Sequence, residues 1–306
     1  MLNISHHARE RSCPVCGGQE NTLFAKEQID SGKMNEYTFA SRKNPEFMCL
    51  RLVRCSNCDL VYAPTPPSSD YLSEAYAEAS FDSGAEARAA AESYARALRP
   101  HLAGIDLQGA AVDVGAGSGA LLPWLQSFGF RHVLGIEPSR AAIDATNPEM
   151  RPYLREGMFS PKIIDDVQPS LICSFMTLEH ISEPGEFVRT AYQLLEPGGR
   201  LAVVVHNWQA PLNRLLGLRS PIIDIEHLQL FCPNALQELL RRNGFSQIAL
   251  QPITNSYPLR YWLRLTPLPQ RIKKFFNSLF DQIAVADLKI PLRVGNILAV
   301  GTKHLD

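Results

Sequence analysis

The chain has 306 residues, 45% of them hydrophobic, so it is long enough to bury one large core or two unequal ones. Its formal net charge is −1, with both signs interspersed, which disfavours a nucleic-acid partner. No apolar run approaches the roughly 20 residues that a membrane span needs, and the polar N-terminus has no signal-peptide core. We therefore expect a cytoplasmic protein.

Two paired cysteine motifs lie in the N-terminal part, Cys13 with Cys16 and Cys55 with Cys58. In a reducing compartment such pairs present four thiolates that can close tetrahedrally on zinc, and the metal then replaces a core that a small segment cannot build. The alternatives are unliganded cysteines and a redox dithiol, although the βαβ context of a redox motif is missing. The pattern predicts a Zn²⁺ site on these four cysteines.

The N-terminal part is predicted to contain short strands at residues 22–25, 47–53 and 60–62. A proline-rich stretch, residues 63–69, then interrupts regular structure and acts as a linker. We therefore expect a zinc-binding module with its linker over residues 1–67 and a second domain over residues 68–306. The second domain begins with helical patterns at residues 71–79 and 86–102.

From residue 110 the chain alternates strands and helices. Strands are predicted at residues 110–114, 132–136, 153–155, 170–175, 200–206 and 247–252. Helices are predicted at residues 119–128, 139–146, 183–195 and 233–243, and a last strand at 295–301. This alternation is typical of an α/β protein with a doubly wound, mostly parallel sheet.

A glycine-rich turn follows the first strand of this series. Gly115, Gly117 and Gly119 let the turn approach a ligand closely, and Glu137, at the end of the next strand, can accept the hydroxyls of a ribose. The glycine spacing departs from a dinucleotide fingerprint, and Asp113 would repel a pyrophosphate but attract a positively charged ligand. A turn without a ligand is the alternative. The pattern favours a nucleoside site for a cationic cofactor.

The segment 113–119, Asp-Val-Gly-Ala-Gly-Ser-Gly, together with Glu137 resembles the cofactor signature of class I S-adenosylmethionine-dependent methyltransferases. Residues 195–201, Leu-Glu-Pro-Gly-Gly-Arg-Leu, resemble a second landmark of that family. The resemblance implies a Rossmann-like methyltransferase fold whose last strand is inserted antiparallel beside the sixth. It implies S-adenosylmethionine as the cofactor, and adenine against the loop after the third strand. That loop lacks the usual Asp, and Met158 is its candidate adenine contact.

Two Glu-His pairs, Glu179-His180 and Glu226-His227, follow predicted strands. Methyl transfer requires that the protein align donor and acceptor and remove a proton, a task that suits histidine near neutral pH. The alternatives are that His180 caps a helix and that His227 packs against the preceding loop. We predict that His227 is catalytic, with Glu226 and His180 as further candidates.

The order of zinc knuckle, linker, tyrosine-bearing helix, methyltransferase core and Glu-His pair resembles the sugar and natural-product branch of the family. Some members C-methylate nucleotide-linked keto-sugars; in them the zinc region and nearby tyrosines close over the sugar, and the Glu-His pair acts at the methylated carbon. Those enzymes carry a further C-terminal domain beyond the length of this chain. The resemblance therefore implies methylation of a hydroxyl, or of an activated carbon, in a small sugar-type or secondary-metabolite acceptor.

Two other functions remain open at this stage. One is a protein or RNA methyltransferase that uses the zinc module for recognition, although the weak basic character disfavours RNA. The other is a catalytically silent cofactor-fold protein whose zinc module mediates assembly.

An insertion at about residues 254–294 is rich in aromatic and basic residues. Within it, residues 271–283 place apolar side chains on one helical face that begins with basic residues. Such a face can cover the substrate cleft or pack against a second subunit in a homodimer. The alternative is a docking surface for a lipid-linked acceptor at a membrane, because basic amphipathic helices bind anionic interfaces.

Overall fold

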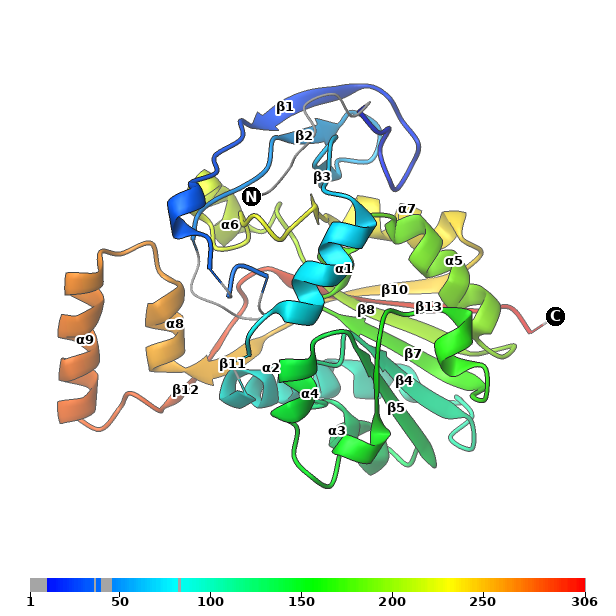
Figure 1. The fold of residues 1–306 in the computed structure, drawn as a ribbon. Helices are drawn as coiled ribbons and strands as arrows, with labels where there is room; N and C mark the ends of the chain where they lie inside the picture. The colour runs from blue at the N-terminus through cyan, green and yellow to red at the C-terminus, as the bar shows by residue number, and fades with distance from the viewer. Residues whose placement is uncertain (1–9, 36, 40–45, 82–83, 306) are drawn as a thin grey trace.

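The computed structural model describes residues 10–35, 37–39, 46–81 and 84–305. Within them, a seven-stranded sheet has the order β10-β13-β8-β7-β4-β5-β6 (Figure 1). Its strands are β10 Ser246–Pro252, β13 Asn296–Thr302, β8 Arg200–His206, β7 Pro169–Phe175, β4 Ala110–Val114, β5 His132–Glu137 and β6 Leu154–Glu156. All neighbours pair in parallel except β13, which is antiparallel to both β10 and β8. The predicted doubly wound sheet and its inserted last strand are confirmed.

Helices cover both faces of this sheet (Figure 1). Side chains alternate between the faces along each strand, so Val112 and Ile172 pack against one helical layer and Ala111 and Leu171 against the other. The first layer contains α5 Pro184–Leu194 and α7 Pro233–Arg242, and the second contains α2 Gly84–Leu98 and α3 Leu122–Ser127. Because helices cover both faces of the sheet, every residue of β4 and β7 is buried, and neither strand alternates between buried and exposed residues.

Three short helices lie at the carboxyl ends of the strands: α1 Ser69–Glu78, α4 Arg140–Asp144 and α6 Pro211–Leu216. Ser68 and Ser139 cap α1 and α4 by accepting a backbone N–H of the first turn. The helix predicted over residues 119–128 begins only at Leu122, because Gly119 has a φ of 66° and closes the preceding turn. Helix ends are otherwise within a few residues of the prediction.

The N-terminal module forms a second sheet with the order β1-β2-β3-β9 in the described residues. Its strands are β1 Asn21–Ala25, β2 Leu52–Cys55, β3 Val61–Tyr62 and β9 Gln229–Leu230. The strand predicted over 47–53 begins only at Leu52, and β9 was not predicted at all. Since β9 follows His227 directly, the module and the larger domain share a sheet beside a predicted catalytic residue.

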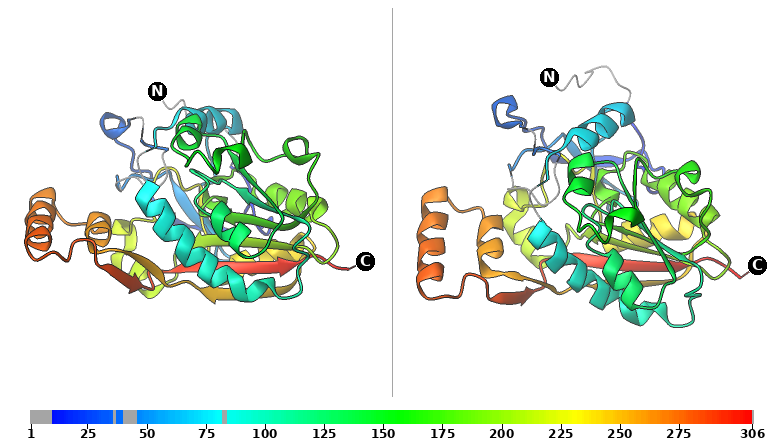
Figure 2. Two further views of the ribbon diagram at one scale, coloured as in Figure 1. Left: turned by 90° about the horizontal axis from the view of Figure 1, so that it is seen from below. Right: turned by 60° about the horizontal axis from the view of Figure 1, so that its bottom comes forward.

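The insertion forms an arm that projects from the body (Figures 1 and 2). Antiparallel strands β11 Asn255–Pro258 and β12 Lys289–Leu292 form its base, and helices α8 Leu259–Leu265 and α9 Gln270–Gln282 form the remainder. Arg264 of α8 forms an ion pair with Glu86 of α2 at 3.4 Å, which connects the arm to the body. The amphipathic helix predicted over 271–283 is confirmed. None of the helices in the described part of the chain is long and apolar enough to span a membrane.

Candidate functional site

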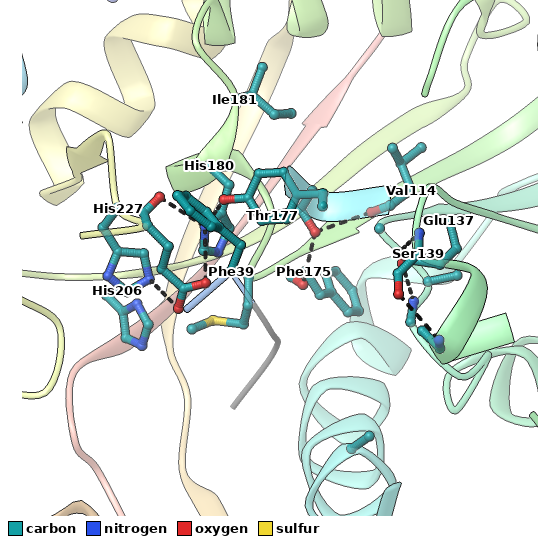
Figure 3. Close-up of a pocket in the computed structure, with 18 of the residues that line it drawn as sticks. Phe39, Val114, Glu137, Ser139, Phe175, Thr177, His180, Ile181, His206 and His227 are labelled. Carbon is teal, nitrogen blue, oxygen red and sulfur yellow. Dashed lines mark hydrogen bonds and ion pairs between the residues drawn. The ribbon is translucent and has the colours of Figure 1, made fainter. Parts of the chain in front are cut away.

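A cavity of about 870 Å³ opens beyond the carboxyl ends of β4, β5, β7 and β8. This volume lies within the range of small-molecule sites, and the end of a parallel sheet is where such sites form. One half of the cavity is lined by the glycine-rich turn and Glu137, and the other by the Glu-His pairs. Figure 3 shows both halves in one view.

The turn after β4 leaves open space for a ligand. Gly115 and Gly117 have φ values of 76° and 54°, a conformation that favours glycine. A Cβ on Gly115 would lie 2.2 Å from the hydroxyl oxygen of Thr177, so that position cannot hold a larger residue. At Gly117 an added Cβ would meet nothing within 4 Å, so the backbone there faces free volume.

Glu137 is buried at the end of β5, with its carboxylate directed at the turn (Figure 3). It accepts the backbone N–H of Gly117 at 2.7 Å and that of Ser139 at 2.8 Å. Burial raises the pKa of Glu137, whereas these two hydrogen bonds lower it. Each carboxylate oxygen has a further acceptor site, so the group can still bind hydroxyls in the cavity.

The other predicted cofactor residues divide into two groups. Asp113, buried at the end of β4, and the half-exposed Met158 line the cavity together with Gly115, Gly117 and Glu137. Gly119 does not line it, and a Cβ there would lie 3.3 Å from Leu122. Gly119 therefore contributes to the conformation of the turn and does not contact the cavity.

The second half brings together all three predicted catalytic residues, of which Figure 3 labels His180 and His227. His180 comes from the turn after β7, and Glu226 and His227 come from the loop before β9. Nδ1 of His180 lies 3.9 Å from Oε2 of Glu226, and Nε2 of His227 lies 4.0 Å from Oε1 of the same carboxylate. The fold thus brings His180 to the carboxylate of Glu226, although the two residues are 46 positions apart in the chain.

The hydrogen bonds of His227 define which ring nitrogen can take up a proton. Its Nδ1 lies 2.9 Å from the carbonyl oxygen of Ile222, and because a carbonyl only accepts, Nδ1 carries the hydrogen. In the neutral ring Nε2 is then the nitrogen without a hydrogen, and it lies 4.0 Å from Oε1 of Glu226. The ring centroid of His227 lies 4.9 Å from that of His180 and 5.3 Å from that of His206.

Several lining residues were not among the predicted site residues. Tyr76 of α1 places its hydroxyl 3.0 Å from Nδ1 of His180. Burial, followed by the charges of Glu226, Asp224 and Glu179, raises the pKa of Tyr76 well above its ordinary value, so the phenol keeps its proton. The sequence signalled only a tyrosine-bearing helix, since nothing local indicates which tyrosine faces the cavity.

Glu179 and Asp224 add two more buried carboxylates to this half. Glu179 accepts the backbone N–H of His206 at 2.7 Å and lies 3.3 Å from that residue's Nδ1. Asp224 lines the cavity between Ile222 and Glu226. Buried carboxylates stabilise a positive charge nearby, so this half of the cavity suits a cationic group.

The trio of His180, Glu226 and His227 can also be considered as a metal site. One ligand atom from each residue lies within 4.8 Å of the others. Nδ1 of His180, however, is 3.2 Å from the carbonyl oxygen of Glu226 as well as 3.0 Å from Tyr76, so that nitrogen already has two partners. The arrangement suits proton transfer directly and a metal only after these contacts rearrange.

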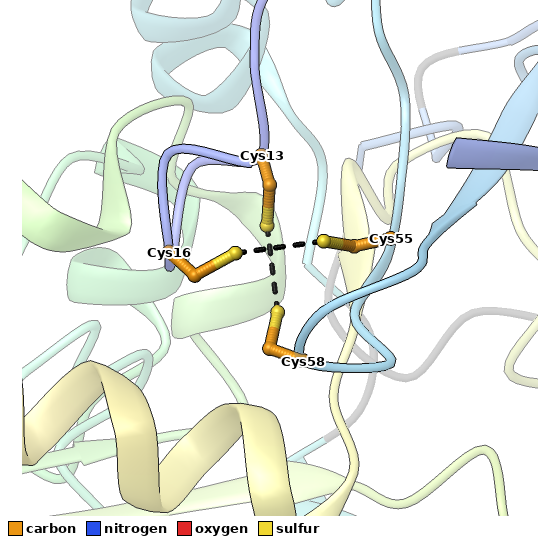
Figure 4. Close-up of side chains that lie close together, drawn as sticks. All are labelled: Cys13, Cys16, Cys55 and Cys58. Carbon is orange, nitrogen blue, oxygen red and sulfur yellow. Dashed lines mark hydrogen bonds between the residues drawn. The ribbon is translucent and has the colours of Figure 1, made fainter. Parts of the chain in front are cut away.

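The four paired cysteines converge at one point of the N-terminal module (Figure 4). Cys13 and Cys58 place their sulfurs 3.5 Å apart, and Cys16 and Cys55 do the same. Tetrahedral zinc with Zn–S bonds of about 2.3 Å separates its sulfurs by about 3.8 Å. The four thiols, none in a disulfide, therefore fit a structural zinc ion.

The second cysteine knuckle, residues 55–58 with Asp59, contacts the segments that follow β8 and β9. The carbonyl oxygen of Cys58 accepts Nδ2–H of Asn234 at 3.2 Å, and that of Asp59 accepts Nε1–H of Trp208 at 3.0 Å. Trp208 lies two residues after His206, and Asn234 lies shortly after β9. The knuckle thus supports both segments that carry histidines into the cavity.

Comparison with known proteins identifies the larger domain. A family model described as a methyltransferase domain matches residues 85–250. Among solved structures, a SAM-dependent methyltransferase from Thermotoga maritima is 18% identical with a TM-score of 0.47, covering 71% of this chain and 90% of that one. A second, from Archaeoglobus fulgidus, is 14% identical with a TM-score of 0.47, covering 77% of this chain and 100% of that one. A search of curated proteins found no match.

Replacing Glu137 should weaken cofactor binding. Hydrogen bonds to a charged group contribute about 1.5–3 kcal/mol, so we expect Glu137→Ala to raise the Kd for S-adenosylmethionine at least about tenfold. Titration calorimetry measures this effect. Glu137→Gln tests the contribution of the negative charge to cofactor binding, because the amide keeps one oxygen that can accept the N–H of Gly117.

Glu156→Ala is the matched control, since Glu156 ends the neighbouring strand but is exposed, pairs with Arg140 at 2.8 Å, and does not line the cavity. Equal Kd values for wild type and Glu137→Ala would contradict the assignment.

Removing one cysteine of the cluster should remove the metal. We expect one zinc per chain in the wild type and its loss in Cys16→Ser, with faster proteolysis of residues 10–63, because structural zinc sites stabilise their own surroundings. Elemental analysis and limited proteolysis measure the two effects. S-adenosylmethionine should still bind, because its predicted contacts lie on β4, β5 and the loop after β6.

Cys49→Ser is the control, since Cys49 is buried in the same module but outside the cluster. Wild-type protein that contains no zinc when prepared without chelator would refute the metal assignment.

Proposed function

We propose, from the premise that the chain belongs to the methyltransferase domain family, that it methylates a hydroxyl, or an activated carbon, of a small sugar-type or secondary-metabolite acceptor. The chain is an enzyme with a Rossmann-like methyltransferase fold. The observation that carries the finer proposal is that His227, with its hydrogen on Nδ1, places Nε2 4.0 Å from Glu226 in the same cavity as the glycine turn.

In this proposal five of the predicted residues contact the cofactor. Glu137 accepts the ribose hydroxyls, Asp113 attracts the positively charged part of the molecule, and Met158 lies against adenine. Gly115 and Gly117 keep the turn free of side chains. When bound, S-adenosylmethionine supplies a methyl group that its positively charged sulfur has already activated.

His227 acts as the general base. It removes the proton of the acceptor hydroxyl, or of the carbon beside a carbonyl, as that atom forms its bond to the methyl group. The electron pair of the broken carbon–sulfur bond stays on sulfur, and the proton goes to Nε2 of His227. One positive charge is lost at sulfur and one is gained on the imidazole, where Glu226 stabilises it at 4.0 Å.

His180 and Tyr76 complete the acceptor half. The Tyr76 hydroxyl oxygen lies 3.0 Å from Nδ1 of His180, and the His180 ring packs beside His227. We propose that this pair holds the acceptor against His227. Asn213 and Asp224, which also line this half, offer further polar contacts to an acceptor with several hydroxyls.

We also propose the division into a zinc module, residues 1–67, and a methyltransferase domain, residues 68–306, with the arm as an insertion at about 254–294. The knuckle contacts with Trp208 and Asn234 support a structural role for zinc over direct macromolecular recognition. Methylation of protein or RNA, and cofactor binding without turnover, are the competing outcomes in an acceptor survey.

Replacing His227 should abolish turnover without weakening cofactor binding. Loss of a positioned base lowers the rate by about 10²–10⁴, so we expect His227→Ala to lower kcat by that order at nearly unchanged Kd for S-adenosylmethionine. Methyl transfer to a panel of sugars and nucleotide-linked sugars measures the rate, and His132→Ala is the control because His132 is exposed at the start of β5.

Activity that survives metal chelation excludes a catalytic metal ion held by His180, Glu226 and His227.

Solvent exchange distinguishes the two classes of acceptor. With a keto-sugar, the wild type should exchange the proton beside the carbonyl with D₂O and His227→Ala should not; an acceptor methylated on oxygen shows no exchange. Full turnover in a folded His227→Ala variant would assign a structural role to this histidine.

A further inference from the structure

Helix α9 carries an apolar stripe that the body of the protein does not cover. Ile272, Phe275, Leu279 and Ile283 follow one another at helical spacing on a single face and are all exposed, Phe275 by 65%. Among the described residues of α9, none is buried. A helix at a protein surface normally packs its apolar face against the core. This stripe therefore needs a partner outside the described fold.

Basic side chains border the stripe. Arg271 lies one turn before Phe275, and Lys274 lies on the flank; both are exposed, and the described structure gives neither an acidic partner. The acid of α9, Asp281, is already paired with Arg260 at 3.3 Å. The stripe is therefore apolar in the middle and positively charged along its edge.

A second surface of the same composition lies on α6 and the turn that follows it. Leu215 of α6 is 83% exposed, Leu218 follows just after the helix, and Arg214 and Arg219 flank them without acids nearby in sequence. Leu212 and Leu216 of α6 line the cavity.

The arm borders the cavity as well. Trp262 and Leu265 of α8, and Pro267 in the connection to α9, belong to its lining. The arm projects from the body beside this opening (Figures 1 and 2). Both α6 and the arm thus contribute residues to the lining of one cavity.

We propose that α9 and α6 dock the enzyme on an anionic lipid bilayer, so that the cavity opens toward the membrane. A bilayer with anionic headgroups accepts apolar side chains into its interface and attracts the Lys and Arg side chains around them. A second copy of the chain would cover the apolar stripe, but Asp281, the acid that α9 would bring to such an interface, is already paired with Arg260. If the proposed methyl transfer is correct, the acceptor of this enzyme is membrane-associated.

Vesicle co-sedimentation tests the proposal. The wild type should bind vesicles of phosphatidylglycerol and phosphatidylcholine, bind pure phosphatidylcholine much less, and lose binding as salt is raised. The double variant Phe275→Ser/Ile283→Ser and the charge variant Arg271→Glu/Lys274→Glu should each lower the partition coefficient at least about tenfold. Leu23→Ser is the control, because Leu23 is an exposed apolar residue of β1, away from the arm.

Two results would overturn the proposal. One is a wild type that shows no preference for anionic vesicles. The other is a wild-type dimer, measured by light scattering, that the Phe275→Ser/Ile283→Ser variant converts to a monomer, because a second copy then covers the stripe. S-adenosylmethionine binding is measured on every variant, so a protein that binds cofactor but no vesicles refutes the docking surface and leaves the proposed function intact.

Discussion

The acceptor half of the cavity depends on hydrogen bonds to a cysteine knuckle that lies far from it in sequence. The carbonyl oxygens of Cys58 and Asp59 hold Asn234 and Trp208, the segments that follow β9 and β8. β3 adds two backbone pairings to β9, directly after His227. A loop of irregular backbone keeps a side chain in place only if its flanks are fixed, and here the flanks are fixed from outside the methyltransferase sheet. The N-terminal module is therefore part of the site's scaffold.

The two halves of the cavity are built by different kinds of interaction. The cofactor half is built by residues that are close in the chain. Glu137, at the end of β5, accepts one hydrogen bond from Gly117 in the turn after β4 and one from Ser139 in its own loop. The acceptor half is assembled from four separate parts of the chain, which contribute Tyr76, His180, His206 and His227. Such a division lets one fold keep its cofactor chemistry while the acceptor changes.

This difference decides what the sequence could predict. The glycine turn and the alternation of strands and helices follow from short patterns, since each is set by residues near one another in the chain. The antiparallel last strand was implied by the resemblance to the methyltransferase family. The contact of Tyr76 with His180, and the pairing of β9 with β3, depend on how distant segments pack, which no local period encodes. The stripe on α9 was readable as amphipathic, but its exposure was not, because the same pattern serves a helix that is buried against its own domain.

The charges around His227 show why its surroundings suit methyl transfer in particular. The reaction begins with a positive charge on sulfur and ends with a proton on the base, so the site holds one cation throughout. Glu179, Asp224 and Glu226 are buried around that position, and a carboxylate in such surroundings is costly unless a cation compensates it. These acids favour the cationic cofactor before the reaction and the protonated imidazole after it. Burial and the charges of these acids keep the proton on Tyr76, so in the proposed mechanism His227 is the group that takes up the proton of the acceptor.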